Sequence, residues 1–308
     1  MKFFKKKCIV AGLIIVVILV FIYSSYKHSE TYRASIQTDE PKIAFLFLTY
    51  TNIKRQDIWI NFFQIDIDNS DDNPNRHSNK YTIYNHAKEP DKVTDPLLKD
   101  KNISTHIETC WGCPNLVEAN LLMMEEALKD PLNKKFILVS DSCVPIVTFE
   151  SFYEESMKNN KSKINLFFNN SPERYDAIVD PEFTKDNFLK HSGSGLVLNR
   201  QHTEILVSEK PNFKKSWQNV FVPDEHYFGN ILNVLDPNFH LNNDPNQVTF
   251  DVWSRAHLKI DNNDIVTDSY IHIKKITNTA IDELRNKKYF FIRKVDKDTE
   301  IDVPYLCA

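Results

Sequence analysis

A helix followed directly by a fully apolar strand constrains this chain of 308 residues more than any other feature. Pro114 suits a first helical position, and apolar side chains then recur on one helical face at Val117, Leu121, Met124 and Leu128. Residues 136–139 (FILV) lack the alternation of a half-exposed strand and are typical of a strand that is covered on both faces. This pair of elements predicts an α/β fold with a mixed, mostly parallel sheet flanked by helices.

A polar cluster ends this strand. Ser140, Asp141, Ser142 and Cys143 follow it directly, and Pro145 closes the segment. In open α/β sheets, ligands bind beyond the carboxyl ends of the strands. We therefore expect chemistry at residues 140–143.

The rest of the chain continues this pattern less regularly. Further strands are predicted at residues 42–49, 81–86, 164–168, 196–198 and 289–295, and further helices at 55–63, 201–207 and from 222 onward, the last with an apolar stripe at Phe228, Leu232 and Leu235. Strand–helix–strand alternation in the first half indicates parallel βαβ units. Because we find neither internal repeats nor a second domain, residues 41–308 are predicted to form one domain.

The N-terminus predicts a membrane anchor. Residues 1–7 contain four lysines, and residues 8–23 are uninterruptedly apolar, which suits a single spanning helix with its positive end in the cytoplasm. A cleavable signal peptide is the alternative, but no small-x-small site follows the run closely. The expected order is a basic cytoplasmic tail (1–7), a transmembrane signal anchor (8–23), a stem (24–40) and a lumenal or extracytoplasmic domain (41–308).

Charge and cysteine content limit the function classes. The net charge of −4 and the pI near 6.2 give no indication of a nucleic-acid partner. Four of the five cysteines follow the apolar run, and the sequence leaves the pairing open among Cys110, Cys113, Cys143 and Cys307. The C-x-x-C spacing of the first two allows a thioredoxin-like redox site only if a strand directly precedes it, and the lack of a second such pair disfavours structural zinc.

Five motifs occur in an informative order: WGCPNLVEA at 111–119, FILVSDSCVP at 136–145, SGS at 192–194, PDEHYF at 223–228 and FFIRKVD at 290–296. Together they resemble the core-2/I-branching β-1,6-N-acetylglucosaminyltransferase family, which also contains the peptide xylosyltransferases and plant membrane proteins. The resemblance covers roughly residues 42–296. It implies a GT-A-like, Rossmann-like fold and a type II membrane topology, with a Golgi or ER location if the host is eukaryotic.

The resemblance also implies a reaction. Such enzymes transfer a sugar with inversion from a UDP-sugar to a hydroxyl of a glycan or glycoprotein, and UDP-GlcNAc is the first candidate donor, ahead of UDP-xylose and UDP-glucuronate. Glu225 matches the family's general base, which takes the proton of the acceptor hydroxyl. The alternative interpretation is that Asp224 and Glu225 only cap the helix that begins there.

The leaving diphosphate needs a positive partner. Most GT-A enzymes use a metal on a D-x-D motif, whereas Asp141 is followed by Ser142 and Cys143 and lacks the second carboxylate. Residues 66–68 (DID) match the D-x-D pattern, but they follow a predicted helix and lead into a loop, so they are not favoured as the motif. The resembled family uses basic side chains without metal or cofactor, and Lys294 matches its lysine. Arg255, Arg293 and Arg285 are candidates for a second cation, with Arg255 preferred for the donor site. A Lys294 merely exposed on an edge strand is the alternative.

The resemblance assigns further donor and acceptor residues. Trp111 and Gly112 match a tight turn before the helix, where free N–H groups can face UDP, although Trp111 could instead be a core residue. Asn115 and Asp141 fall at donor-side positions. On the acceptor side the expected residues are Glu173, Arg174 and Trp253.

Two departures from the family pattern are evident. His86 is followed by Ala87 and Lys88, without the usual carboxylate near the uridine, and Gly195 follows SGS in place of an aromatic residue. Two other classes therefore stay open. One is a membrane-anchored glycan- or nucleotide-binding protein without turnover, and the other is a membrane-tethered thiol oxidoreductase that uses Cys110 and Cys113.

Overall fold

The computed structural model describes residues 23, 40–65, 75, 77–168, 172–179, 183, 188–251, 264–268 and 271–301. The chain divides into two compact units, residues 1–40 and 41–308, and the description below concerns the second. Within the described part of the chain, no helix has the length and apolar character needed to cross a membrane. The predicted anchor at 8–23 lies outside that part except for Tyr23.

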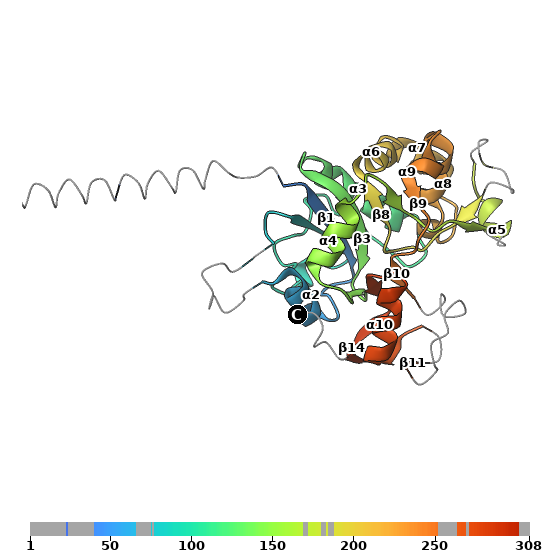
Figure 1. Ribbon diagram of the computed structural model, residues 1–308. Helices are drawn as coiled ribbons and strands as arrows, with labels where there is room; N and C mark the ends of the chain where they lie inside the picture. Colours follow the sequence, from blue (N-terminus) through green and yellow to red (C-terminus); the bar gives the residue numbers. More distant parts are fainter. Residues whose placement is uncertain are drawn as a thin grey trace, which may run out of the picture. The chain divides into compact units, whose positions relative to one another are not determined.

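The centre of the second unit is a mixed sheet of six strands in the order β2-β1-β3-β8-β5-β9 (Figure 1). Its strands are β1 (Lys42–Thr49), β2 (Tyr81–Ala87), β3 (Asn133–Ser140), β5 (Ser162–Lys163), β8 (Val197–Asn199) and β9 (Asn243–Asp244). β1 pairs in parallel with both β2 and β3, whereas β8 runs antiparallel to β3 and β5. The predicted α/β class and the mixed, parallel-rich sheet are confirmed.

Burial on both faces explains the apolar runs of β1 and β3. Ala44 and Leu46 of β1 face one hydrophobic cluster, and Phe45 and Phe47 face the other. The first cluster includes α3 (Asn115–Leu128), α6 (Arg200–Ser208), α7 (Lys210–Ser216), α8 (Tyr227–Leu235) and α9 (Phe239–Asn242), and the second includes α2 (Gln56–Phe63) and α4 (Phe149–Met157). Helices therefore cover both faces of the sheet, as the apolar runs predict.

Smaller elements complete the unit. Figure 1 shows α10 (Asn278–Asn286), β11 (Ile265–Thr267) and β14 (Val295–Ile301) grouped at the bottom of the view, where β12 (Ile273–Ile276) lies between the two strands of its sheet. β10 (Thr249–Phe250), β13 (Phe291–Ile292) and β4 (Val144–Pro145) form another small sheet, and β6 (Phe167–Phe168) pairs with β7 (Leu189–Lys190). The remaining turns are η1 (Pro90–Lys92), α5 (Pro172–Tyr175) and η2 (Pro223–Glu225).

Two predicted strands are wrong as single elements. Residues 164–168 do not form one strand, because the chain leaves the central sheet after β5 and pairs again, at β6, in a separate hairpin. Residues 289–295 are interrupted at Arg293 and Lys294, since β13 and β14 belong to different sheets. In the stripe predicted after residue 222, Leu235 is exposed because it ends α8, whereas Phe228 and Leu232 are buried.

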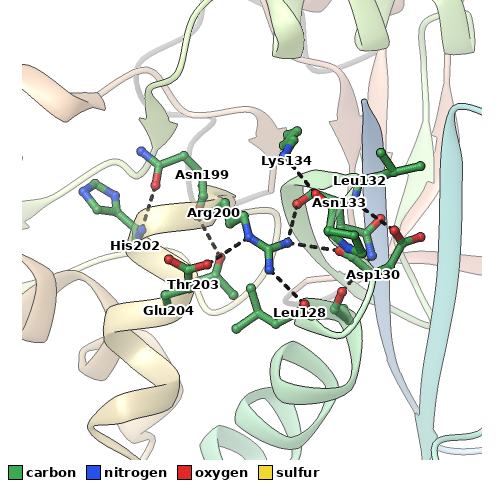
Figure 2. A network of polar contacts seen from close by, with 12 residues as sticks. Leu128, Asp130, Leu132, Asn133, Lys134, Asn199, Arg200, His202, Thr203 and Glu204 are labelled. Atoms are coloured by element: carbon green, nitrogen blue, oxygen red, sulfur yellow. Dashed lines mark hydrogen bonds and ion pairs between the residues drawn. The ribbon is translucent and has the colours of Figure 1, made fainter. Parts of the chain in front are cut away.

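Arg200 ties three elements together at the end of the sheet where β3 begins. Figure 2 shows its guanidinium donating to the carbonyl oxygens of Leu128 (2.9 Å), Asp130 (3.0 Å) and Asn133 (3.1 Å). The last carbonyls of a helix have no partner within the helix, so this side chain at the start of α6 satisfies the end of α3 and its link to β3. Arg200 also pairs with Glu204, whose side chain is 54% exposed.

We expect Arg200→Met to lower the free energy of unfolding by about 2–3 kcal/mol, because three carbonyl oxygens lose a charged donor. Urea unfolding monitored by circular dichroism measures this difference. Glu204→Gln is the matched control, since it removes only the exposed ion pair and should cost less than about 0.5 kcal/mol. Equal losses in the two variants would contradict the role of the carbonyl contacts.

Candidate active site

The carboxylates of Asp224 and Glu225 lie on a short 3₁₀ turn, η2, and not on the helix that follows. α8 begins at Tyr227, and the preceding residue, His226, makes no side-chain cap. The interpretation that Asp224 and Glu225 only cap a helix is therefore wrong. Both side chains instead line a cavity.

This cavity has a volume of about 540 Å³, within the usual range for small-ligand sites. It lies at the carboxyl ends of the parallel strands, because Leu48 of β1 and residues 138–140 of β3 form part of its wall. The other walls come from α3, β6, α5, β7, the SGS segment, η2 and Arg293 and Lys294. Another cavity, of about 490 Å³, lies beside β2, but no carboxylate lines it. The cavity of about 540 Å³ is therefore the candidate active site, because carboxylates and cations line it and it lies where ligands are predicted to bind.

One oxygen of Glu225 is held by two cations. Its Oε2 accepts hydrogen bonds from Arg174 Nη1 (2.8 Å) and Lys190 Nζ (3.0 Å), while Oε1 has no partner among the described residues. Burial raises the pKa of the Glu225 carboxyl, but the hydrogen bonds from Arg174 and Lys190 outweigh it, so the net pKa lies below the usual value. Glu225 is therefore ionised at neutral pH, with one oxygen fixed and the other available.

His226 orients one of these cations. Its Nδ1 lies 2.9 Å from the carbonyl oxygen of Leu189, and since a carbonyl only accepts, Nδ1 carries the hydrogen. Nε2 is then the acceptor for Arg174 Nη1 at 3.0 Å. Burial lowers the pKa of His226 to about 4, which keeps the ring neutral and able to accept. Arg174 is thus held between a neutral imidazole and the Glu225 carboxylate.

Lys190 reaches Glu225 because two backbone segments meet. The N–H of His191, directly after β7, donates to the carbonyl oxygen of Glu225 at 2.8 Å. Gly193 lies just beyond, and a Cβ there would come within 3.0 Å of Asp224 Oδ2, so a side chain would press on this carboxylate. The KHSGS sequence at 190–194 therefore packs directly against the acidic turn and forms the adjoining part of the cavity wall.

Asp224 differs from its neighbour. Its Oδ1 is buried without a hydrogen-bond partner in the described part of the chain. Burial, together with the nearby charge of Glu225, raises the pKa of Asp224 to about 6. The two adjacent carboxyl groups thus have pKa values displaced in opposite directions, a pattern associated with functional sites.

Arg293 and Lys294 supply the positive charge of another wall. They lie where the chain passes from β13 to β14, and the N–H of Val295 donates to the carbonyl oxygen of Ser142 at 2.8 Å, which joins this corner to the polar cluster after β3. Neither side chain makes a hydrogen bond or an ion pair with a described residue, and Arg293 Nε is buried. Burial lowers the pKa of Lys294, with Arg293 adding to the shift and Asp141 opposing it.

The predicted site residues separate into two groups. Trp111, Gly112, Arg174, Glu225 and Lys294 line the same cavity. Asn115 is exposed, and its amide donates to the carbonyl oxygen of Glu108 (2.8 Å) rather than lining the cavity. Glu173 is also exposed on α5, and Asp141, next to the cavity-lining Ser140, accepts from the N–H of Tyr50 at 3.3 Å. Trp253, Arg255 and residues 66–68 lie outside the described residues.

Trp111 is not a core residue. It is 77% exposed, and its ring meets that of Phe221 edge to face at 5.4 Å. Of the other second-cation candidates, Arg285 donates to the carbonyl oxygen of Ile146 and pairs with Asp282 outside the cavity lining, whereas Arg293 lines the cavity. Lys190 also lines the cavity and was not among the predicted site residues. Its position two residues before the SGS motif is the signal in the sequence that could have indicated it.

The structure describes three of the four cysteines whose pairing the sequence leaves open, and Cys307 lies outside the described residues. Cys110 and Cys113 form a disulfide, and Cys143 is free and buried. Residues 103–109 are all described and form no strand, so the strand that a thioredoxin-like site needs before Cys110 is absent and that interpretation is wrong. Within the described residues, no three His, Cys, Asp or Glu side chains gather as a metal site.

The fold and the site define an α/β protein with a cavity at the carboxyl ends of its parallel strands. The ion-paired carboxylate of Glu225 lies on one wall of this cavity, and Arg293 and Lys294, which have no ion-pair partner among the described residues, lie on another. Comparison with known proteins gives the family. The chain belongs to the core-2/I-branching enzyme family, whose model matches residues 43–285. It is 25% identical over 234 residues to glycosyltransferase BC10 of Oryza sativa subsp. japonica; the match covers 66% of this chain and 56% of that relative's length.

We expect Lys190→Met to raise the pKa of the Glu225 carboxyl, because one of two donors to Oε2 is lost while the burial remains. NMR titration of glutamate carboxyl carbons, assigned with the help of Glu225→Gln, measures the change. Lys275→Met is the control, since the one ion pair that Lys275 makes with a described residue is with the exposed Glu300. An unchanged Glu225 titration in Lys190→Met would contradict a contribution of Lys190 to the lowered pKa of Glu225.

Proposed function

We propose that this protein is an inverting, metal-independent glycosyltransferase that moves a sugar from a UDP-sugar to a hydroxyl of a glycan or glycoprotein acceptor. The observation that carries the proposal is the charge arrangement of one cavity. Glu225 is fixed there by one oxygen, and Arg293 and Lys294, which have no ion-pair partner in the described part of the chain, lie on another wall. Membership of the core-2/I-branching family and the glycosyltransferase name of the plant relative support it. GlcNAc is the preferred transferred sugar, with xylose and glucuronic acid as alternatives.

Glu225 acts as the general base in this proposal. The acceptor hydroxyl transfers its proton to the free Oε1 as its oxygen forms a bond to the sugar's anomeric carbon, and the bond from that carbon to the diphosphate breaks on the opposite face. Arg174 and Lys190 keep Oε2 occupied, which directs the proton to Oε1. Because the lowered pKa of Glu225 keeps it ionised at neutral pH, the base is ready before the acceptor binds.

Arg293 and Lys294 stabilise the departing UDP. Charge develops on the diphosphate as the bond to the sugar breaks, and cations that are fixed beforehand stabilise it without reorganisation. Among the described residues, neither side chain has a carboxylate ion-pair partner, and this supports the role because no described carboxylate neutralises their charge. Burial, which lowers the pKa of Lys294, also reduces the local dielectric constant, and this strengthens its interaction with an anion.

The remaining assignments follow the family resemblance. On the donor side we propose Trp111, Gly112, Asn115, Asp141 and Arg255, and on the acceptor side Glu173, Arg174 and Trp253. Contact between Arg174 and Glu225 supports an acceptor role for Arg174, because the acceptor hydroxyl must approach the base. A membrane anchor at residues 8–23, with the enzyme unit on the lumenal or extracytoplasmic side and no bound cofactor, completes the proposal.

Glu225→Gln should lower kcat by about 10²–10⁴-fold, because an amide oxygen is too weak a base to accept the acceptor proton. UDP release, measured with a panel of UDP-sugars and glycan acceptors, tests this. Glu204→Gln serves as the control, since Glu204 is exposed on α6 outside the cavity lining. Saturable UDP binding without turnover in the unmodified protein would instead favour a binding protein that has lost catalysis.

Lys294→Ala should lower kcat by about 10²–10³-fold, because one preorganised charge at the leaving group is lost. EDTA should leave the activity of the unmodified enzyme unchanged. The same UDP-release assay, run with and without EDTA and added Mn²⁺, measures both effects. Strict dependence on Mn²⁺ would overturn the assignment of the leaving-group role to basic side chains.

A further inference from the structure

The Cys110–Cys113 disulfide closes a loop at the edge of the cavity. Only Trp111 and Gly112 lie between the two cysteines, and both line the cavity. Cys110 is exposed, whereas Cys113 is half-buried just before α3. The proposed chemistry assigns no role to this bond, although it joins the ends of a wall segment.

The closed loop contacts the segment that leads into the acidic turn. The carbonyl oxygen of Gly112 accepts a hydrogen bond from the N–H of Val222 at 2.8 Å. Trp111 packs edge to face on Phe221, and a Cβ on Gly112 would lie 2.6 Å from the Phe221 ring. Gly112 also has φ +73°, which glycine adopts readily. The loop and residues 221–222 therefore fit closely along both backbone and rings.

The backbone conformation of Val222 is unfavourable on its own and therefore needs contacts such as this one to hold it. Its φ of 55° and ψ of 49° are left-handed, an unfavourable conformation for a β-branched residue. Its carbonyl oxygen accepts from the N–H of Glu225 at 3.2 Å, so the conformation of Val222 sets the start of the η2 turn. A strained residue persists only where its surroundings hold it, and the Gly112 carbonyl is one such partner.

We propose that the Cys110–Cys113 disulfide is a positioning element for the acidic turn: it holds the Trp111–Gly112 loop against Val222 and thereby fixes the direction of Glu225. The catalytic part of this inference rests on the proposed function. Reduction removes the constraint, lets the Gly112 carbonyl move away from Val222 and reorients η2. Activity is then sensitive to thiol reductants although no cysteine takes part in the reaction.

The reduction step is ordinary thiol–disulfide exchange. A thiolate of a dithiol reagent attacks the exposed Cys110 sulfur, the Cys110–Cys113 bond breaks, and Cys113 leaves as a thiolate that takes up a proton. The reagent's second thiol then releases Cys110 as a thiol and closes the reagent's own disulfide. Two electrons pass from the reagent to the protein, and two thiols form.

The test compares the full-length chain, oxidised or treated with dithiothreitol, with the double variant Cys110→Ser/Cys113→Ser. Hydrogen–deuterium exchange of a peptide that contains Val222 reports the clamp directly, without any need for activity. We expect faster exchange there after reduction and in the double variant, and a fall in kcat of about tenfold or more with a smaller change in KM for the donor. Dithiothreitol should have no further effect on the double variant, which controls for the other cysteines.

The outcomes separate the clamp from the proposed function. Unchanged exchange at Val222 after complete reduction, verified by alkylation and mass spectrometry, overturns the inference whatever the activity. Faster exchange with unchanged kcat also overturns it, because η2 would then not depend on the clamp. If no donor gives turnover even in the oxidised protein, the proposed function fails, while faster Val222 exchange still supports the structural clamp. Reduction of the folded, unmodified chain decides the question if the double variant does not fold.

Discussion

Burial of the central strands on both faces is the constraint on which the rest of the structure depends. Alternate residues of β1 enter two different hydrophobic clusters, so each face must be covered by helices and no polar side chain fits along the strand. Most of the β1 side chains are therefore apolar, and the polar groups discussed here lie where the strands end, although Asn85 and Lys135 are buried within β2 and β3. At one end Arg200 satisfies backbone carbonyls, and at the other the strand ends open into the cavity with Glu225 and Lys294. The division between a structural end and a chemical end follows from the same burial.

Within the cavity, competition between burial and ion pairing decides the charge states. Glu225 and Asp224 are adjacent and both resist ionisation through burial, yet only Glu225 has Arg174 and Lys190 within hydrogen-bond distance. Glu225, the ion-paired group, stays ionised, and its charge adds to the effect of burial in raising the pKa of Asp224. Two different acid–base characters thus arise in one dipeptide, because Asp224 is more deeply buried and Glu225 is ion-paired, and neither difference is evident from the sequence.

The elements with strong local patterns were predictable, and those made by distant contacts were not. β1, the centre of β3 and α3 are apolar runs or stripes, which are strong local signals for their secondary structure. The 3₁₀ turn at η2 depends on a hydrogen bond between Val222 and Gly112, more than a hundred positions apart, and the break at Arg293 depends on Val295 pairing with Ser142. Motif order predicted Glu225 and Lys294 as site residues, and both line the cavity, whereas Lys190 joins Glu225 only through the hairpin of β6 and β7.

In this fold, access to the cavity, more than residue type, distinguishes side chains that can meet a ligand from side chains with a structural role. Ser162, His202 and Asp236 form a hydrogen-bonded chain of 2.6 and 3.0 Å with the residue types of a hydrolytic triad. All three are at most 5% exposed, and Ser162 Oγ also accepts the N–H of Asn199, so its hydroxyl is committed to linking β5, α6 and the end of α8. Glu225, in contrast, lines a cavity large enough for a ligand, and its Oε1 has no partner among the described residues. In the proposed function, this position is chemically competent because a Glu225 oxygen has no partner among the described residues and shares the cavity with Arg293 and Lys294, and not because it belongs to a familiar set of residues.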